Sequence, residues 1–304
     1  MDTAIDKILA QLVPDLGDLV GDVTPLEGGI TNRNFRARLG GRDYVIRMPG
    51  KDTSLLGIDR SAEMQANECA AALGIAPAVA AMLTDPPALV TGFVEGEQMT
   101  AEDLREPATM AEVAHALRQV HDSGSEVPTR FDSFRLVEEY AATAAERGVE
   151  VPPAYQEAHE HAAAIEKAVS GPEHEPVLCH NDLLAGNFLR GGRIWIVDWE
   201  YTGMGDRFFD LANFAVNNEY SSPQYEELLA AYYGERPPPG RAASLHLMVF
   251  MSDFREAMWG VVQQGISDID FDFVEYATKH FTRMRETAAN PHFAARLEEA
   301  SATG

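Results

Sequence analysis

The pattern of apolar and polar positions changes its period near Gly96. Before that point apolar and polar residues mostly alternate, which is the period of a half-buried strand. The pair Gly40-Gly41 lies between two alternating runs and is typical of a tight hairpin turn. Strands are predicted at 23–26, 35–39, 44–48 and 88–94, and helices at 2–13, ending before Pro14, and at 61–73. This part of the chain is therefore expected to form a small antiparallel sheet with two helices.

After Gly96 the apolar residues recur at helical spacing. Helices are predicted at 101–121, 133–147 and 154–169 and over most of the chain after Asp210, with a break at Pro237-Pro238-Pro239. A short apolar run at 177–179 and a hairpin at Gly191-Gly192 interrupt this helical part. The pattern predicts an α+β fold in which residues 1–96 form a sheet-rich N-lobe and residues 97–304 form a larger, mainly helical C-lobe. A ligand is expected to bind in the cleft between the lobes.

Charge and composition narrow the range of partners. The net charge of −24 makes nucleic acid a poor partner and agrees with a small cationic substrate, although an acidic surface also aids solubility. The chain has no apolar run of about 18 residues that would predict a membrane span, and its start does not resemble a secretory signal. Its two cysteines, Cys69 and Cys179, lie in apolar contexts and are expected to be free thiols. We expect a cytoplasmic protein, either a monomer or a homodimer.

Three polar residues in the text HNDLLAGN and VDWEY carry the candidate chemistry. Asp182 and Asn187 lie five positions apart, and Asp198 follows a run of Ile, Trp, Ile and Val. This spacing is typical of phosphoryl transfer from a nucleotide, in which one carboxylate deprotonates the acceptor hydroxyl and an amide and a second carboxylate hold Mg²⁺. Asp182 is therefore predicted to be the catalytic base, Asn187 and Asp198 the metal ligands, and ATP and Mg²⁺ the cofactors. Asn181 and Trp199 replace an Arg and a Phe of the protein-kinase motifs, which favours a small-molecule acceptor.

Two further residues are expected to support this loop. The ring nitrogens of His180 can tie backbone groups of the loop together. Asp210, in FFDLANF, is predicted to lie at the start of a helix and to brace the catalytic loop, with a plain helix N-cap as the alternative.

The N-lobe contains candidate phosphate-binding groups. Arg47, in YVIRMP, stands where a kinase places the lysine of its third strand, and Glu63 is its expected helix partner, with Glu68 as the second choice. Neither a P-loop nor a dinucleotide fingerprint occurs in the chain. The predicted cofactor-binding residues are Gly28, Gly29, Thr31, Asn32, Arg47, Glu63 and Phe93.

With these residues in view, the chain resembles the choline/ethanolamine kinase family, within the aminoglycoside-phosphotransferase-like, protein-kinase-like superfamily. The resemblance runs from about Leu26 to about Phe281 and is carried by GGITNRNFRAR, YVIRMPG, HNDLLAGN, VDWEY and MWGVVQQGISDIDFDFVEYATKHF. It implies a protein-kinase-like bilobal fold. It also implies transfer of the ATP γ-phosphate to the hydroxyl of an amino alcohol, choline or ethanolamine.

The resemblance further implies an acceptor site made of aromatic and acidic side chains, because aromatic faces attract a quaternary ammonium group. The matching aromatic positions are Tyr201, Trp259 and Tyr276. Glu200 adjoins Tyr201, and Glu219-Tyr220 is a candidate second pair of an acidic and an aromatic residue. The chain departs from the family at Val262, where a second tryptophan is common, and at Asn217, near a position that is acidic in some relatives. Because the acceptor site would then have fewer aromatic walls, an alternative function stays open. This alternative is an aminoglycoside, thiamine or other amino-sugar phosphotransferase on the same scaffold.

A third hypothesis is a non-catalytic pseudokinase that binds a nucleotide or an amine. The presence of Asp182, Asn187, Asp198 and Arg47 argues against it, because an inactive descendant would commonly have lost one of them.

Overall fold

The structure is a computed structural model that describes residues 3–26, 32–50, 53–267 and 269–302. Its strands are β1 (Thr24–Leu26), β2 (Asn32–Leu39), β3 (Arg42–Pro49), β4 (Val79–Thr84), β5 (Pro87–Gly92), β6 (Glu97–Gln98), β7 (Val177–Cys179), β8 (Phe188–Arg190), β9 (Ile194–Ile196) and β10 (Gly203–Gly205). Its α-helices are α1 (Thr3–Leu16), α2 (Arg60–Ala72), α3 (Ala101–Arg105), α4 (Pro107–His121), α5 (Ser133–Glu146), α6 (Ala154–Ala168), α7 (Arg207–Asn217), α8 (Ser222–Tyr233), α9 (Pro239–Ile266), α10 (Phe273–Ala288) and α11 (Phe293–Ser301). Short 3₁₀ turns include η3 (Ala185–Asn187) and η4 (Trp199–Tyr201).

The first strands form one antiparallel sheet in the order β1-β2-β3-β5-β4. The β2–β3 ladder ends at the Leu39–Arg42 pair, and the two-residue loop between them is Gly40-Gly41. Both loop glycines have positive φ angles, of 55° and 83°, which a glycine adopts without the steric cost of a side chain. The predicted hairpin therefore forms, and it fixes which β3 residues face the cleft.

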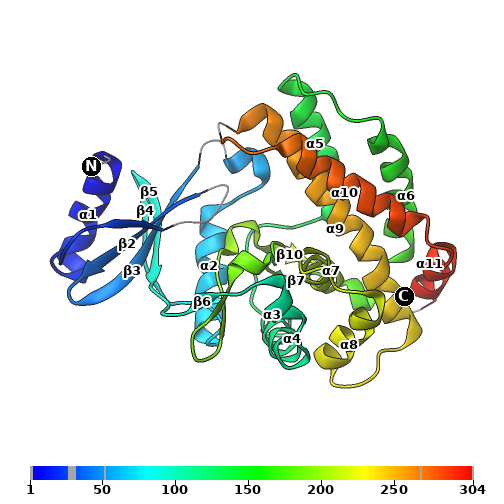
Figure 1. Cartoon of the computed structure of the whole chain (residues 1–304), viewed down its shortest axis with the longest axis horizontal. Coiled ribbons are helices and arrows are strands. Elements are labelled where there is room, and N and C mark those ends of the chain that lie inside the picture. Colours follow the sequence, from blue (N-terminus) through cyan, green and yellow to red (C-terminus); the bar gives the residue numbers. More distant parts are fainter. Residues whose placement is uncertain (1–2, 27–31, 51–52, 268, 303–304) are drawn as a thin grey trace.

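Helix α1 covers one face of this sheet, at the left of the molecule in Figure 1. Its apolar stripe includes Ile5, Ile8 and Leu12, which pack with sheet residues such as Ile46 and Val90. The prediction that this helix ends before Pro14 is wrong, because the helix continues to Leu16. A proline removes only its own N–H, and the last turn is closed by the Gly17 N–H, which donates to the Val13 carbonyl at 2.9 Å.

Two other predictions of local structure need correction. The helix expected over 101–121 is divided at Glu106, because Pro107 lacks an N–H donor and begins α4 as a new helix. Strand β4 was not expected, since Val79–Thr84 does not alternate in polarity. This segment is a strand because its backbone pairs with β5, and its own sequence pattern does not predict that pairing.

The apolar core is divided into two clusters, and α2 belongs to the larger one. Ala62, Ala66 and Ala70 of α2 are fully buried with C-lobe residues, whereas the smaller cluster joins α1 to the sheet. In Figure 1, α2 lies between the sheet and the helices of the C-lobe. The lobe boundary near Gly96 stays a prediction.

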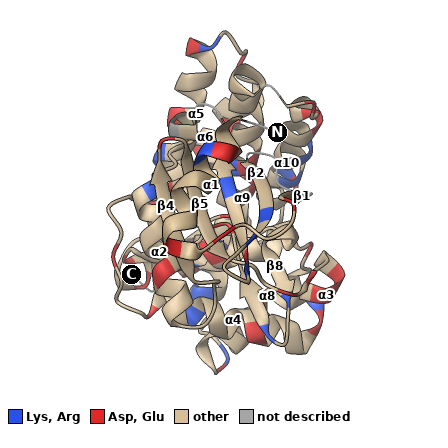
Figure 2. Ribbon diagram, turned by 90° about the vertical axis from the view of Figure 1, so that its left-hand side faces the viewer, with Lys and Arg blue, Asp and Glu red and all other residues tan. Residues whose placement is uncertain are grey.

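The C-lobe is built around α9, which is buried along most of its length and packs against α5, α7 and α10. Acidic residues are distributed over many elements, α3 among them (Figure 2). Within the described residues, no helix is both long enough and apolar enough to cross a membrane. The antiparallel sheet followed by a helical lobe confirms the predicted α+β fold class.

Candidate active site

A cavity of about 310 Å³ lies between the sheet and the loop that follows β7. Its apolar walls come from both lobes, with Val45 and Leu89 on one side and Leu189 on the other. Its polar end contains Arg47, Asn187 and Asp198. The full lining is Leu26, Asn34, Val45, Arg47, Asn67, Pro77, Leu89, Thr91, Gly92, Phe93, Val94, Gly96, Gln98, Gly186, Asn187, Leu189, Val197 and Asp198. A slot with apolar walls and charges at one end can hold a nucleotide base and its phosphates.

Asp182 is in direct contact with Asn187, which lines this cavity. The Asn187 side-chain amide nitrogen donates to the Asp182 backbone carbonyl at 2.8 Å and lies 3.4 Å from Asp182 Oδ2. Because Nδ2 is used in this way, Oδ1 is the Asn187 atom that could bind a cation. Asp182 itself is buried, with 9% of its surface exposed.

His180 and Asp210 hold the loop around Asp182. The fully buried His180 ring accepts from the Asp182 N–H at 3.2 Å and donates to the Val197 carbonyl at 3.0 Å. Asp210 accepts from the N–H groups of His180 at 3.0 Å and Asn181 at 2.7 Å. These bonds stabilise Asn181 in a left-handed conformation, with φ of 67°.

Asp210 is not the helix N-cap, because Asp206 caps α7 and Asp210 lies in its first turn. Burial by itself would raise the pKa of Asp210, but the hydrogen bond and charge of His121 and the contacts with His180 outweigh burial and lower it. Asp210 is thus ionised beside the loop amides that it accepts from.

Arg47 connects the sheet to both α2 and the end of β9. Its guanidinium forms ion pairs with Glu63 and with Asp198. Glu68, the second choice, is exposed on α2, whereas Glu63 is buried. Arg60 donates to Glu63 at 2.7 Å and to Glu200 at 3.1 Å. Glu63 is therefore shared by two arginines, one on each side of it.

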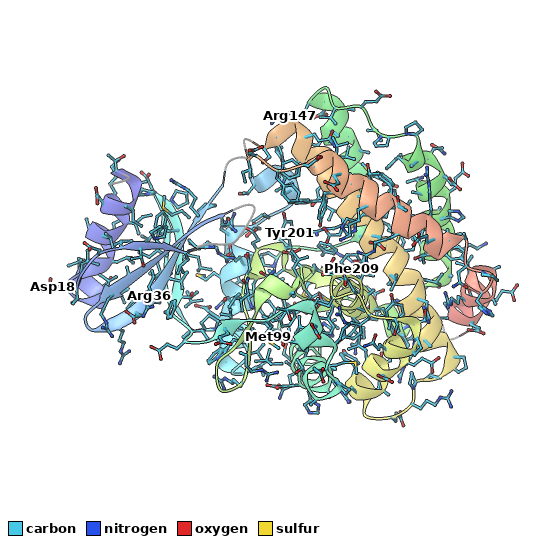
Figure 3. All side chains as sticks on the ribbon, in the orientation of Figure 1. Asp18, Arg36, Met99, Arg147, Tyr201 and Phe209 are labelled. Atoms are coloured by element: carbon cyan, nitrogen blue, oxygen red, sulfur yellow. The ribbon has the colours of Figure 1, made fainter. Side chains whose placement is uncertain are left out.

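A second group of side chains lies on the other side of Asp182. We call Tyr201, Glu256, Trp259 and Tyr276 the Trp259 cluster. The Trp259 indole N–H donates to the Tyr201 hydroxyl at 2.9 Å, and the Tyr276 hydroxyl donates to Glu256 at 2.8 Å. The Trp259 and Tyr276 rings meet edge to face, with centroids 5.4 Å apart. Figure 3 labels Tyr201 near the middle of the molecule, where the lobes meet.

Arg255 joins this cluster to Asp182. Its Nη1 donates to Glu256 Oε1 at 2.7 Å and lies 3.5 Å from Asp182 Oδ1, and its Cζ is 4.4 Å from the centre of the Tyr201 ring. Burial raises the pKa of Asp182 to about 8, the Arg255 charge opposes this shift, and neighbouring carboxylates add to it. A raised pKa means that the carboxylate holds a proton more firmly once it has accepted one, and only the ionised form of Asp182 can act as a general base.

Other predicted residues lie elsewhere. Gly28, Gly29 and Thr31 fall outside the described residues. Asn32 is buried at the start of β2, opposite Pro49.

Glu219 and Tyr220 contact α3 instead of the Trp259 cluster. Glu219 is 3.5 Å from Arg105, and the Tyr220 hydroxyl donates to the Leu104 carbonyl. Among the described contacts, none joins either residue to the Trp259 cluster.

The sequence reasoning missed Arg255, Glu256 and Arg60. The first two form a charged pair inside the apolar helix α9, and both are almost fully buried. Such a pair in an apolar run indicates a function or a partner, because buried charges need compensation. That signal was available in the text FREAMWG.

The residues at the polar end of the cavity are suited to Mg²⁺. Asp198 offers a carboxylate and Asn187 an amide oxygen, and hard oxygen donors in small number are what Mg²⁺ takes from proteins when phosphates and water complete its shell. Asp198 pairs here with Arg47, so positive charge already lies beside it.

The fold and the arrangement of Asp182, Asn187 and Asp198 define a protein-kinase-like phosphotransferase. The model of the phosphotransferase enzyme family (APH) matches residues 22–243. A choline/ethanolamine kinase family protein from Mesorhizobium loti has a similar structure, with a TM-score of 0.84 and 31% identity over 98% of this chain and 99% of that one. The choline kinase LicA from Streptococcus pneumoniae shares the fold, with a TM-score of 0.78 and 22% identity over 94% and 99% of the two chains.

Named relatives agree with these structures. Ethanolamine kinase 2 of Mus musculus is 29% identical over 272 residues, which cover 80% of this chain and 69% of the relative. Probable choline kinase 3 of Arabidopsis thaliana is 23% identical over 316 residues, 90% of each chain. The chain belongs to the phosphotransferase enzyme family, and its resemblance to the choline/ethanolamine kinases is confirmed. It is a kinase of small molecules.

Proposed function

We propose that this kinase transfers the γ-phosphate of ATP to the hydroxyl of a small amino alcohol, choline or ethanolamine. The observation that carries the proposal is the position of Asp182. It contacts Asn187, which lines the cavity, on one side and Arg255, which belongs with the Trp259 cluster, on the other. A base placed between a nucleotide site and an aromatic, acidic site can act on a hydroxyl held by the second site.

The cavity is the proposed ATP site. Val45, Leu89 and Leu189 offer apolar walls to a base, and Phe93, which follows β5, also lines the cavity. Arg47 can bind the phosphates with two N–H groups, while Glu63 keeps the guanidinium oriented. Asn187 and Asp198 would hold Mg²⁺, which would neutralise charge on the phosphates.

Asp182 is the proposed catalytic base. It accepts the proton of the acceptor hydroxyl while the oxygen forms a bond to the γ-phosphorus and the bond from that phosphorus to the ADP oxygen breaks. The His180 and Asn187 bonds to the backbone of Asp182 fix where its carboxylate lies. That fixed position supplies the orientation on which phosphoryl transfer depends.

The Trp259 cluster is the proposed acceptor site. Tyr201, Trp259 and Tyr276 offer aromatic faces and Glu256 offers a negative charge, and this combination attracts an ammonium group. The names of the relatives, ethanolamine kinase and choline kinase, support the same acceptor class.

A panel assay with Mg-ATP tests the proposal. Choline, ethanolamine, thiamine and an aminoglycoside are each offered, and phosphorylated product is measured by mass. We expect product from an amino alcohol. Turnover confined to amino sugars or thiamine would show that the acceptor is not an amino alcohol, and it would leave the proposed kinase chemistry unchanged. Absence of transfer to every amine, despite amine binding, would support the pseudokinase hypothesis.

A further inference from the structure

One side chain in the proposed acceptor site is itself a cation. Arg255 is 1% exposed, lies with Cζ 4.4 Å from the centre of the Tyr201 ring, and donates to Glu256 at 2.7 Å. A positive group on an aromatic face and beside a carboxylate occupies the environment that would recognise the ammonium of a ligand.

We infer that Arg255 is a resident cation of the acceptor site, and that it makes the enzyme select a primary ammonium and exclude a quaternary one. The inference rests on the proposed function. It names the substrate class more narrowly, as amino alcohols with a free –NH₃⁺ group.

The reason lies in how the two headgroups bind. A trimethylammonium group has no N–H, so aromatic faces and unpaired negative charge are its means of recognition. Arg255 already covers the Tyr201 face and pairs with Glu256. A primary ammonium donates up to three hydrogen bonds. Glu256 already accepts from Arg255, Asn213 and Tyr276, and because a carboxylate has about four lone-pair sites, one site is left for a donated N–H of the ammonium. Val262 adds no aromatic face one turn after Trp259.

Arg255 is poorly explained as a purely structural residue. Its Nε and Nη2 atoms are buried and have no hydrogen-bond partner within 3.5 Å among the described residues. The Tyr140 hydroxyl donates to the Leu56 carbonyl at 3.2 Å, and its oxygen lies near enough to Arg255 to act on the guanidinium as an acceptor. A buried structural arginine usually has its N–H groups satisfied. Charge and the aromatic face, more than a complete set of hydrogen bonds, therefore hold this guanidinium.

The experiment replaces the cation and measures whether a quaternary ammonium takes its place. Arg255→Gln keeps much of the volume and removes the charge, and Arg255→Ala removes both. Arg255→Lys keeps a charge. Arg283→Gln is the matched control, since Arg283 pairs with the buried Asp253 at 3.3 Å outside the Trp259 cluster. Tetramethylammonium binding is followed by intrinsic tryptophan fluorescence and by the shift in melting temperature, and kcat/KM is measured for ethanolamine and choline.

We expect the native enzyme to prefer ethanolamine and to show no response to millimolar tetramethylammonium. Arg255→Gln and Arg255→Ala should bind tetramethylammonium and be stabilised by it. Their ethanolamine-to-choline ratio of kcat/KM should fall by at least about tenfold. Arg255→Lys and Arg283→Gln should keep the native ratio.

Two results would overturn the inference: equal use of choline and ethanolamine by the native enzyme, or neutral variants that gain no affinity for tetramethylammonium. If Arg255→Gln and Arg255→Ala do not fold, the preference of the native enzyme between ethanolamine and choline decides the inference. If the native enzyme phosphorylates neither amine, the proposed function fails, and tetramethylammonium binding to the variants still decides whether Arg255 fills the cation position.

Discussion

Arg47 and Asp198 form an ion pair across the cleft between the lobes. One is the proposed phosphate-binding cation and the other a proposed metal ligand, so the two neutralise each other in this structure. A nucleotide with its metal brings a negative partner for Arg47 and a positive partner for Asp198. The pair can therefore open on binding without leaving either charge uncompensated.

The first prediction concerns Asp182. Asp182→Ala should lower kcat by roughly 10²- to 10⁴-fold, as for loss of a positioned base, and leave ATP affinity nearly unchanged. Asn187 bonds the backbone carbonyl of residue 182 at 2.8 Å, so it stays in place when the side chain is removed. Steady-state kinetics and titration with a fluorescent ATP analogue separate the two effects. A variant as active as the parent would disprove the role of Asp182.

The second prediction concerns the metal. Asp198→Asn should weaken binding of Mg-ATP by at least roughly 10- to 100-fold, the range found even for residues that only support metal ligands. With EDTA present the same variant should bind free ATP no worse than the parent, because Arg47 loses a competing carboxylate. Calorimetry with and without Mg²⁺ checks both parts. An equal loss under both conditions would contradict a metal-binding role.

The third prediction concerns the acceptor site. Trp259→Ala should raise the KM for the amine by roughly 5- to 30-fold, corresponding to about 1–2 kcal/mol of cation–π attraction, and change the KM for ATP little. Trp195→Ala, which removes a tryptophan from the β8–β9 hairpin where it packs on Arg193, is the control. Equal effects on both KM values would instead indicate that Trp259 only packs in the core.

The fourth prediction concerns pH. The pKa of Asp210 is lowered in the folded protein, so its contribution to stability is present above its ordinary value of 3.8 and is lost as the pH falls through the folded pKa. Asp210→Asn should destabilise the protein at neutral pH by on the order of 2 kcal/mol, because charged hydrogen bonds to the loop amides are lost. Its stability should then fall less steeply in acid than that of the parent.

Urea unfolding measures these slopes from pH 7 down to the lowest pH at which the parent stays folded, because the Asp210 contribution is lost below pH 3.8. Asp122→Asn, which changes the net charge equally at an exposed position, is the control. Parallel curves for Asp210→Asn and the parent would show that Asp210 does not supply this acid dependence.

Local patterns in the sequence were enough for the fold class and for the three residues that meet around the cavity. The spacing of Asp182, Asn187 and Asp198 along the chain predicts that they lie close together, because only a short loop and one hairpin separate them. The pairing of Arg47 with Glu63 could be predicted only from the resemblance to kinases. The residues between them give no information on how the sheet packs against α2.

Contacts between distant segments could not be read from the sequence. Helical spacing places Arg255 on α9, but it does not show that η4 brings the Tyr201 ring beneath the guanidinium. Strand β4 depends in the same way on its partner β5. Glu219 and Tyr220 were chosen by their residue types, and their neighbours in α3 lie more than a hundred positions earlier in the chain.

The packing of α2 bears on how the cleft can close. Because Ala62, Ala66 and Ala70 are anchored in the larger core, a rigid-body tilt of the sheet would carry Arg47 along and leave Glu63 behind with the catalytic loop. Glu63 would then keep its position while the Arg47 guanidinium moves with the sheet. The two side chains would therefore form their ion pair only at one degree of cleft closure.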